Sequence, residues 1–290
     1  MPFRRFFCLA LSWAAGLVLI ANLLAGPARA EALDGRPLRI GLLPTNAPLS
    51  LLRLYDPLRS YLQNRLGRPV ELYTAPNFRS SFADVKNGEF DLLVTAPHFG
   101  VVAVDMGYVP LVRYKAELRP LIVVPKGSSL TQGEQLRGMK VLTANRLTAL
   151  SVVTETWLES RYGMVAGRDY QLVDAASHAS AIRAVGMGDA DAAISSSSAL
   201  KQVPDEIRNR VDSFEASIAV PHQFTLAHRR LGTQRIAALR AALADFPDSE
   251  EGRRFFAASG FQGYAPLTPQ DVEAARPYAD KVVKMIETPL

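Results

Sequence analysis

The sequence contains very little cysteine: its 290 residues include one, Cys8, in an apolar stretch near the N-terminus. The rest of the chain therefore has no thiol nucleophile and cannot form a disulfide. The four histidines, His98, His178, His222 and His228, do not have the spacing of a metal site. We expect a protein that is stabilised by its hydrophobic core and that holds no metal.

The sequence motifs of common enzyme classes are also missing. The chain has no G-x-S-x-G elbow, no G-x-x-x-x-G-K-[ST] loop and no H-E-x-x-H helix. Asp189 and Asp191 are close in sequence, but their small neighbours and the strand pattern that follows favour a surface turn over a catalytic pair. A secreted hydrolase stays an alternative without an assigned nucleophile or base. We expect no enzyme and no cofactor.

The long apolar run of the sequence lies at its N-terminus. Arg4 and Arg5 precede the uncharged residues 6–28, and the run ends in Ala28-Arg29-Ala30. A basic start, an apolar middle and an A-x-A ending are typical of a secretory signal peptide. A transmembrane anchor fits the length of the run but not its ending. The sequence predicts a signal peptide at 1–30 and a soluble periplasmic protein.

The excess of basic residues is small once residues 1–30 are set aside. The whole chain has 33 basic and 28 acidic residues. Three of the arginines fall within the predicted signal peptide, so the remaining 260 residues carry a net charge of about +2. This charge is too low to predict binding to nucleic acid or to an anionic membrane. We expect a monomer, large enough for one or two hydrophobic cores.

Apolar β-type runs alternate with helical patterns along the chain, which is typical of βαβ units. Strands are expected at 38–43, 70–73, 91–95, 121–124, 140–143, 170–173 and 190–194. Helices are expected at 49–66, 80–86, 98–106, 148–162 and 180–186. Because the pattern restarts without a flexible linker, we predict two α/β lobes joined by short crossovers near 113–119 and 214–226.

Polar residues follow three of the expected strands. At the carboxyl ends of parallel strands, helix N-termini offer free N–H groups and a positive dipole end to an anion. The polar residues at these ends are Thr45, Asn46, Thr95, His98, Asn145, Arg146 and Thr148. Each alone is typical of an ordinary helix cap. Their recurrence after successive strands predicts a shared ligand site.

Three segments together resemble a known family. They are LRIGLLPTNAPLSLLRLYDPLRSYLQNRLGRPVELYTAPNF (38–78), NGEFDLLVTAP (87–97) and ASHASAIRAVGMGDADAAISS (176–196). In order and spacing they resemble the periplasmic phosphate/phosphite/phosphonate-binding proteins of ABC importers. The resemblance implies a type II periplasmic-binding-protein fold, an α/β architecture of two lobes, each a mostly parallel sheet flanked by helices. It implies lobe 1 at 31–115 and 222–290, lobe 2 at 116–221, and a ligand in the cleft between them.

The resemblance also implies which residues line the pocket. The Ser-Thr-Ser-Gly stretch of the family corresponds to residues 146–149, where Thr148 alone keeps a hydroxyl. Arg146 either offers a forked set of donors to an oxyanion or is a solvated loop arginine. Further pocket positions of the family correspond to Phe78, Thr95 and His178.

Two further positions bear on the chemistry of the ligand. Family members that bind aminoalkyl phosphonates hold the ammonium group with two acidic residues, and Ser198 and Gln223 stand at those positions here. A buried ammonium without a carboxylate costs roughly several kcal/mol. The resemblance thus implies a small anion without an amine, such as phosphate, phosphite or an alkyl phosphonate, delivered to an ABC permease. The alternative is a sensory protein with the same clamp that signals to a membrane histidine kinase or chemoreceptor.

Overall fold

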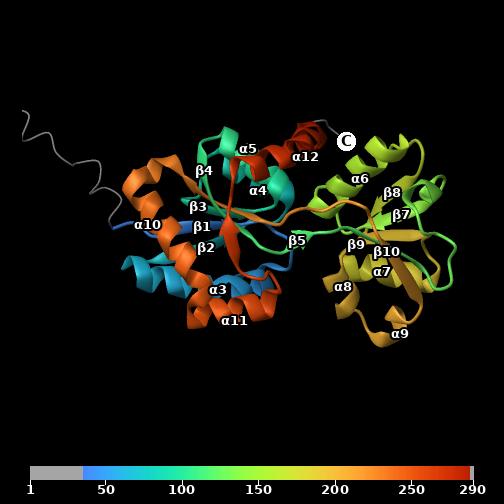
Figure 1. Cartoon of the computed structure of the whole chain (residues 1–290), viewed down its shortest axis with the longest axis horizontal. Coiled ribbons are helices and arrows are strands. Elements are labelled where there is room, and N and C mark those ends of the chain that lie inside the picture. The colour runs from blue at the N-terminus through green and yellow to red at the C-terminus, as the bar shows by residue number, and fades with distance from the viewer. Residues whose placement is uncertain (1–34, 288–290) are drawn as a thin grey trace, which may run out of the picture.

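The computed structural model describes residues 35–287, which form two lobes joined by extended segments (Figure 1). The predicted signal peptide at 1–30 lies outside the described residues. We use lobe 1 for the part built on a six-stranded sheet and lobe 2 for the part built on a five-stranded sheet. Within residues 35–287, no helix combines the length and the apolar character that a membrane span requires.

The sheet of lobe 1 has the strand order β13-β4-β12-β3-β1-β2. Its strands are β1 (Leu38–Leu42), β2 (Val70–Thr74), β3 (Leu92–Thr95), β4 (Tyr108–Tyr114), β12 (Phe224–His228) and β13 (Tyr264–Pro266). Strand β1 pairs in parallel with β2 and β3, whereas β12 pairs antiparallel with both β3 and β4. Strands β1 to β4 therefore run in one direction, and their carboxyl ends lie at one edge of the sheet.

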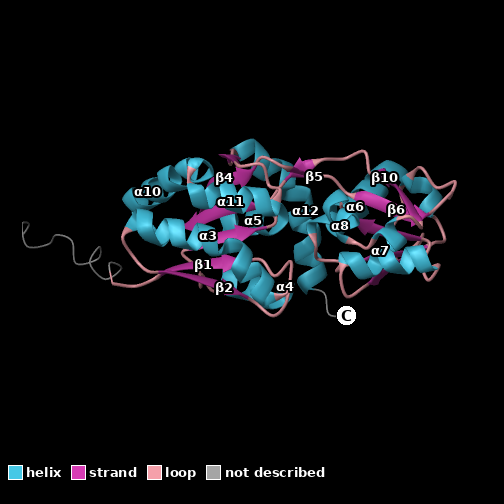
Figure 2. Cartoon of the chain, turned by 90° about the horizontal axis from the view of Figure 1, so that it is seen from below, coloured by secondary structure: helices cyan, strands magenta, loops and turns pink. Residues whose placement is uncertain are grey.

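Helices cover both faces of this sheet (Figure 2). They are α3 (Pro48–Leu66), α4 (Phe78–Lys86), α5 (Pro97–Asp105), α10 (Gly232–Asp245), α11 (Glu250–Ser259) and α12 (Pro269–Glu287), with short 3-10 helices η2 (Arg229–Leu231) and η3 (Phe246–Asp248). Successive residues of β3 point to opposite faces, as a strand requires. Leu92 and Val94 belong to the core under α3, α10 and α11, whereas Leu93 belongs to the core under α4, α5 and α12.

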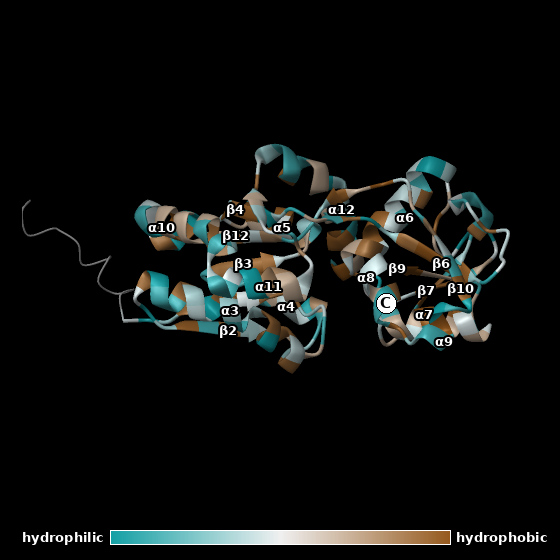
Figure 3. Ribbon diagram, turned by 60° about the horizontal axis from the view of Figure 1, so that its bottom comes forward, coloured by the Kyte–Doolittle hydropathy of each residue, from teal (hydrophilic) through white to brown (hydrophobic). Residues whose placement is uncertain are grey.

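Lobe 2 repeats this plan with the strand order β10-β6-β9-β7-β8. Its elements are β6 (Leu121–Pro125), η1 (Gly133–Leu136), β7 (Lys140–Thr143), α6 (Ala149–Tyr162), β8 (Gln171–Asp174), α7 (His178–Met187), β9 (Ala192–Ser195), α8 (Ser197–Gln202), α9 (Asp205–Arg208) and β10 (Val211–Glu215). Strand β7 is parallel to β8 and β9, and β6 is antiparallel to its neighbours β9 and β10. Figure 3 shows hydrophobic strands inside both lobes and hydrophilic outer helix faces.

Two extended segments connect the lobes. The first contains β5 (Glu117–Leu118) and the second contains β11 (Val220–Pro221), and the two strands pair antiparallel between the lobes (Figure 1). The crossovers are shorter than the predicted 113–119 and 214–226, because the ends of those ranges belong to β4, β10 and β12. Each crossover thus enters and leaves a sheet almost directly, which keeps the two sheet edges close.

The lobes also share an apolar contact beside the crossovers. Leu147, Val152 and Val153 of lobe 2 belong to the same buried cluster as the α4, α5 and α12 side of lobe 1. The Lys281 ammonium on α12 lies 3.0 Å from the Glu159 carboxylate on α6. The C-terminal helix α12 therefore bridges the two lobes, and the crossovers are not their sole connection.

Gly252 allows α11 to pack closely against the preceding segment. A methyl group at this position would overlap the main-chain carbonyl of Phe246. We expect Gly252→Ala to lower the free energy of unfolding by about 1–3 kcal/mol or more, as overpacking does. Gly186→Ala in α7 is the matched control, because its nearest neighbours would lie 3.5 Å away. Thermal unfolding followed by circular dichroism should show a loss only for Gly252→Ala, and equal melting temperatures would contradict the close packing.

Candidate functional site

Loops that connect strands to helices gather where the two lobes face each other. The carboxyl ends of β1, β2 and β3 are followed by α3, α4 and α5, and those of β7, β8 and β9 by α6, α7 and α8. We call the edge formed by these helix starts the inter-lobe face. A helix start carries unpaired N–H groups and the positive end of the helix dipole. Both lobes therefore contribute positive potential to the same region.

The helix starts of lobe 1 differ in how they are capped. The Asn77 side chain caps α4 by accepting a hydrogen bond from the Ser80 N–H at 2.9 Å. Helices α3 and α5 begin with Pro48 and Pro97, and neither has a side-chain cap. Proline lacks an N–H, so the first available donors are those of the next residues in the first turn. These two uncapped helix starts suit a ligand that accepts hydrogen bonds.

Thr45 and Asn46 lie in the loop between β1 and α3. Both residues are exposed. The main-chain N–H of Thr45 donates to the Leu43 carbonyl at 2.8 Å, which fixes the turn. The structure therefore places both residues on the inter-lobe face, where their side chains are accessible to a ligand.

Three other predicted site residues of lobe 1 are buried. Phe78, Thr95 and His98 have exposed fractions of 8%, 1% and 1%. Phe78 stacks on Phe99, with ring centroids 6.2 Å apart. Thr95 lines an internal hollow of about 10 Å³, which is too small for a phosphonate. These side chains form the base of the inter-lobe face rather than its surface.

His98 connects the two lobes. Its Nε2 lies 3.1 Å from the carbonyl oxygen of Leu147, in the loop before α6. Burial lowers the pKa of His98 to about 4. The ring is neutral near pH 7, and Nε2 donates its proton to this carbonyl. In this conformation the histidine joins the lobes.

In lobe 2, Asn145 and Thr148 form the cap of α6. The Thr148 hydroxyl donates to the Asn145 carbonyl at 2.9 Å and accepts from the Ser151 N–H at 3.3 Å. The Asn145 Oδ1 accepts from the Leu147 N–H at 2.9 Å. Because the hydroxyl proton of Thr148 is already used, the main-chain N–H groups of the first turn are the donors that remain for an anion.

Arg146 forms an ion pair inside lobe 2. Its Nη2 lies 2.8 Å from Oε2 of Glu155, a residue on α6 that is 3% exposed. The hydrogen bond to Glu155 raises the pKa of the Arg146 guanidinium. The main-chain N–H of Arg146 donates to Asp174 at 3.0 Å. Much of the charge of Arg146 is therefore balanced within the lobe, while 42% of its side chain stays exposed.

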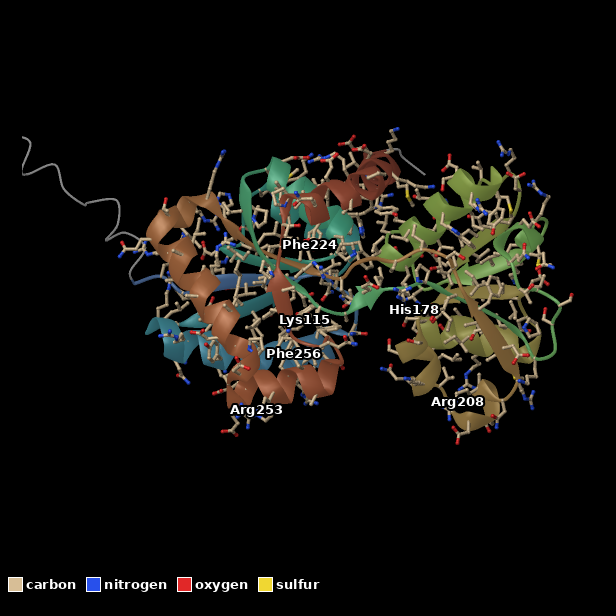
Figure 4. The ribbon with its side chains drawn as sticks, viewed as in Figure 1. Lys115, His178, Arg208, Phe224, Arg253 and Phe256 are labelled. Carbon is tan, nitrogen blue, oxygen red and sulfur yellow. The ribbon has the colours of Figure 1, made fainter. Side chains whose placement is uncertain are left out.

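His178 and Ser198 lie at the starts of α7 and α8. Figure 4 shows His178 at the edge of lobe 2 that faces lobe 1. Its Nδ1 is buried and has no close hydrogen-bond partner among the described residues. Burial lowers the pKa of the ring, against a smaller opposite effect of the Ile194 main chain. Ser198 is exposed, with its hydroxyl 2.9 Å from that of Ser196. His178 is thus a half-buried, neutral ring with an unsatisfied nitrogen near the inter-lobe face.

Gln223 and Lys115 lie where the crossovers meet lobe 1. The Gln223 Oε1 accepts a hydrogen bond from the Tyr55 hydroxyl at 3.0 Å. Lys115 follows β4 directly, is exposed, and makes no ion pair with the residues that the structure describes. Sequence reasoning did not select Lys115. The sequence did offer one signal for Lys115, which is that it lies inside a predicted crossover. Crossovers border the space between the lobes.

Two α/β lobes that the chain crosses between twice, with helix starts facing each other, define a type II periplasmic-binding-protein fold. A family model described as "ABC transporter, phosphonate, periplasmic substrate-binding protein" matches residues 40–272. The chain belongs to this family of periplasmic substrate-binding proteins.

Solved structures show the same architecture. PhnD1 from Prochlorococcus marinus in complex with methylphosphonate has a TM-score of 0.74 at 14% identity, covering 87% of this chain and 100% of that one. A binding protein component of an ABC phosphonate transporter from Pseudomonas aeruginosa has a TM-score of 0.68 at 12% identity, covering 89% and 91%. The aliphatic sulphonate binding protein SsuA from Escherichia coli has a TM-score of 0.60 at 17% identity, covering 86% and 87%. At these identities the likeness establishes the fold.

Two histidines, the buried His98 and the partly buried His222, predict how stability depends on pH. An unfolded histidine has a pKa near 6.5, whereas the folded values of His98 and His222 are about 4. Between these pKa values the unfolded chain binds more protons, so stability is full above about pH 6.5 and falls as the pH drops toward 4. We expect His98→Gln to reduce the acid-induced loss of unfolding free energy by roughly 3 kcal/mol at pH 4. Thermal unfolding at stepped pH tests this, and a variant as acid-sensitive as the parent would contradict it.

Proposed function

We propose that this protein captures a small oxyanion without an amine, such as phosphate, phosphite or a simple alkyl phosphonate, between its lobes and delivers it to an ABC permease. The observation that carries this proposal is the arrangement of helix starts from both lobes around one inter-lobe face. Such an arrangement binds negative charge through main-chain N–H groups. Residues 1–30 would direct the export of the chain.

The ligands named for similar structures agree with this chemistry. One is bound to methylphosphonate, and another is an aliphatic sulphonate binding protein. Phosphonate and sulphonate groups share a tetrahedral oxyanion that accepts several hydrogen bonds. The family model describes a transporter component, and this favours transport over the sensory alternative.

The charges near the proposed site favour an anion without a cationic group. Ser198 and Gln223 are uncharged, and the Glu155 carboxylate is paired with Arg146. Lys115, whose side chain lies beside Gly263, makes no ion pair with the described residues and leaves a free positive charge where the first crossover begins. An ammonium group on the ligand would be placed near helix starts, where the potential is unfavourable to it.

A binding panel on the purified protein without residues 1–30 tests the proposed ligand. We expect calorimetry to show binding of phosphate, phosphite, methylphosphonate or ethylphosphonate, and weaker binding of 2-aminoethylphosphonate. Small-angle scattering of the same samples should show a smaller radius of gyration at saturating ligand, because the lobes close on it. Tighter binding of the amine, or no binding of any oxyanion, would refute the proposal.

Arg146 requires a test that separates ligand binding from folding. Arg146→Ala alone would leave the buried Glu155 charge unpaired, which costs about 3–5 kcal/mol. We therefore compare Glu155→Gln with the double variant Arg146→Gln/Glu155→Gln, both of which avoid an unpaired buried carboxylate. If the guanidinium contacts the oxyanion, the double variant should bind about ten- to a hundredfold more weakly. Equal dissociation constants for the two variants would assign Arg146 a purely structural role.

A further inference from the structure

A chain of buried hydroxyl groups ends at Gln223. Tyr55 of α3 and Tyr114 at the end of β4 are 2% and 0% exposed. The Tyr55 hydroxyl lies 3.0 Å from the Tyr114 hydroxyl and 3.0 Å from the Gln223 Oε1. Three segments that are distant in sequence therefore meet at one hydrogen-bonded cluster, directly below the point where the crossovers join lobe 1.

The direction of the protons in this cluster follows from counting donors. A tyrosine hydroxyl has one proton to donate. Burial raises the pKa of both tyrosines, so both hydroxyls stay protonated. The Gln223 amide oxygen can only accept, so the single proton of Tyr55 is given to Gln223 and Tyr55 must accept from Tyr114. Tyr114 donates to Tyr55, and Tyr55 then donates to the amide oxygen of Gln223.

The main chain of Gln223 is also held in place. Its N–H donates to Nδ1 of His222 at 2.8 Å, and its carbonyl accepts from the Tyr114 N–H at 3.2 Å. The side-chain amide nitrogen makes no hydrogen bond to the described residues, and the residue is partly exposed. Because the oxygen is tied to Tyr55, the amide N–H₂ group points away from the buried cluster.

We propose that Tyr55 is a positioning residue for ligand selection: its hydroxyl fixes the Gln223 amide so that N–H donors, and not the carbonyl oxygen, face the space between the lobes. This inference rests on the proposed function, in which the ligand binds there. An amide N–H₂ group fixed in this way cannot accept a hydrogen bond from an ammonium group. It can only donate hydrogen bonds to an oxygen of the ligand. Tyr55 thereby excludes amine-bearing ligands without touching them.

The test compares ethylphosphonate and 2-aminoethylphosphonate, which differ in one amine, by calorimetry. In Tyr55→Phe the amide is free to turn its oxygen toward an ammonium group. We expect the preference for ethylphosphonate over the amine to fall about fivefold, the equivalent of one neutral hydrogen bond. In a Gln223→Ala background the same Tyr55→Phe change should leave the ratio of dissociation constants unaltered.

Tyr264→Phe is the matched control. Tyr264 is a buried tyrosine whose ring stacks on that of Tyr114. Its hydroxyl makes no hydrogen bond to Tyr55 or Gln223 among the described residues, so its removal leaves Gln223 held by Tyr55. We expect this variant to keep the ligand ratio of the parent. A ratio changed as much as in Tyr55→Phe would show a general effect of the cluster and overturn the inference.

A second variant keeps the inference testable if Tyr55→Phe folds poorly. Gln223→Glu places a carboxylate at the same position, still able to accept from Tyr55, and should shift the preference toward the amine by about tenfold or more. Suppose that the parent binds ethylphosphonate normally while Gln223→Glu, or folded Tyr55→Phe, keeps the parent's preference for ethylphosphonate over the amine. That result overturns this inference alone and leaves the proposed function standing. Absence of any phosphonate binding by the parent overturns the proposed function and this inference with it.

Discussion

The direction of the strands determines where the candidate site lies. Strands β1 to β4 point one way in lobe 1, and β7 to β10 do so in lobe 2. Short connections then bring each helix start to the carboxyl end of its strand. Because the chain passes between the lobes at these same ends, the helix starts of one lobe come to face those of the other. The apolar contact of α12 with α6 and the His98 hydrogen bond to Leu147 hold the two lobes together in this arrangement.

In the proposed function, this arrangement makes the main chain the main source of hydrogen-bond donors for the anion. The side chains that sequence reasoning assigned to the anion are largely engaged elsewhere, Arg146 with Glu155 and the Thr148 proton with the Asn145 carbonyl. Main-chain N–H groups and helix dipoles remain, and they do not depend on residue type. Solved structures that are 12–17% identical to this chain share its fold.

Much of the fold was predictable because its signals are local. The strands and helices expected between 38 and 195 all overlap observed elements, since apolar spacing and turn residues decide each of them within a short window. Strand β12 was read mainly as part of the second crossover, and most of β4 was not assigned. Strand β12 is buried on both faces and pairs with strands far away in sequence, so its short apolar run carries no period of its own. The helices after residue 231 were not assigned.

The sequence by itself determined the two α/β lobes, the family resemblance and the loops of the candidate site, because these depend on composition and spacing along the chain. Only the tertiary structure decided the burial, the protonation and the hydrogen-bond partners of each side chain. His98 is neutral because packing between distant segments buries its ring, and its proton is donated to a carbonyl of the other lobe. The Gln223 amide oxygen accepts a hydrogen bond from Tyr55, which lies 168 positions away in the sequence. Such partners are set by packing between distant segments, and no local pattern records them.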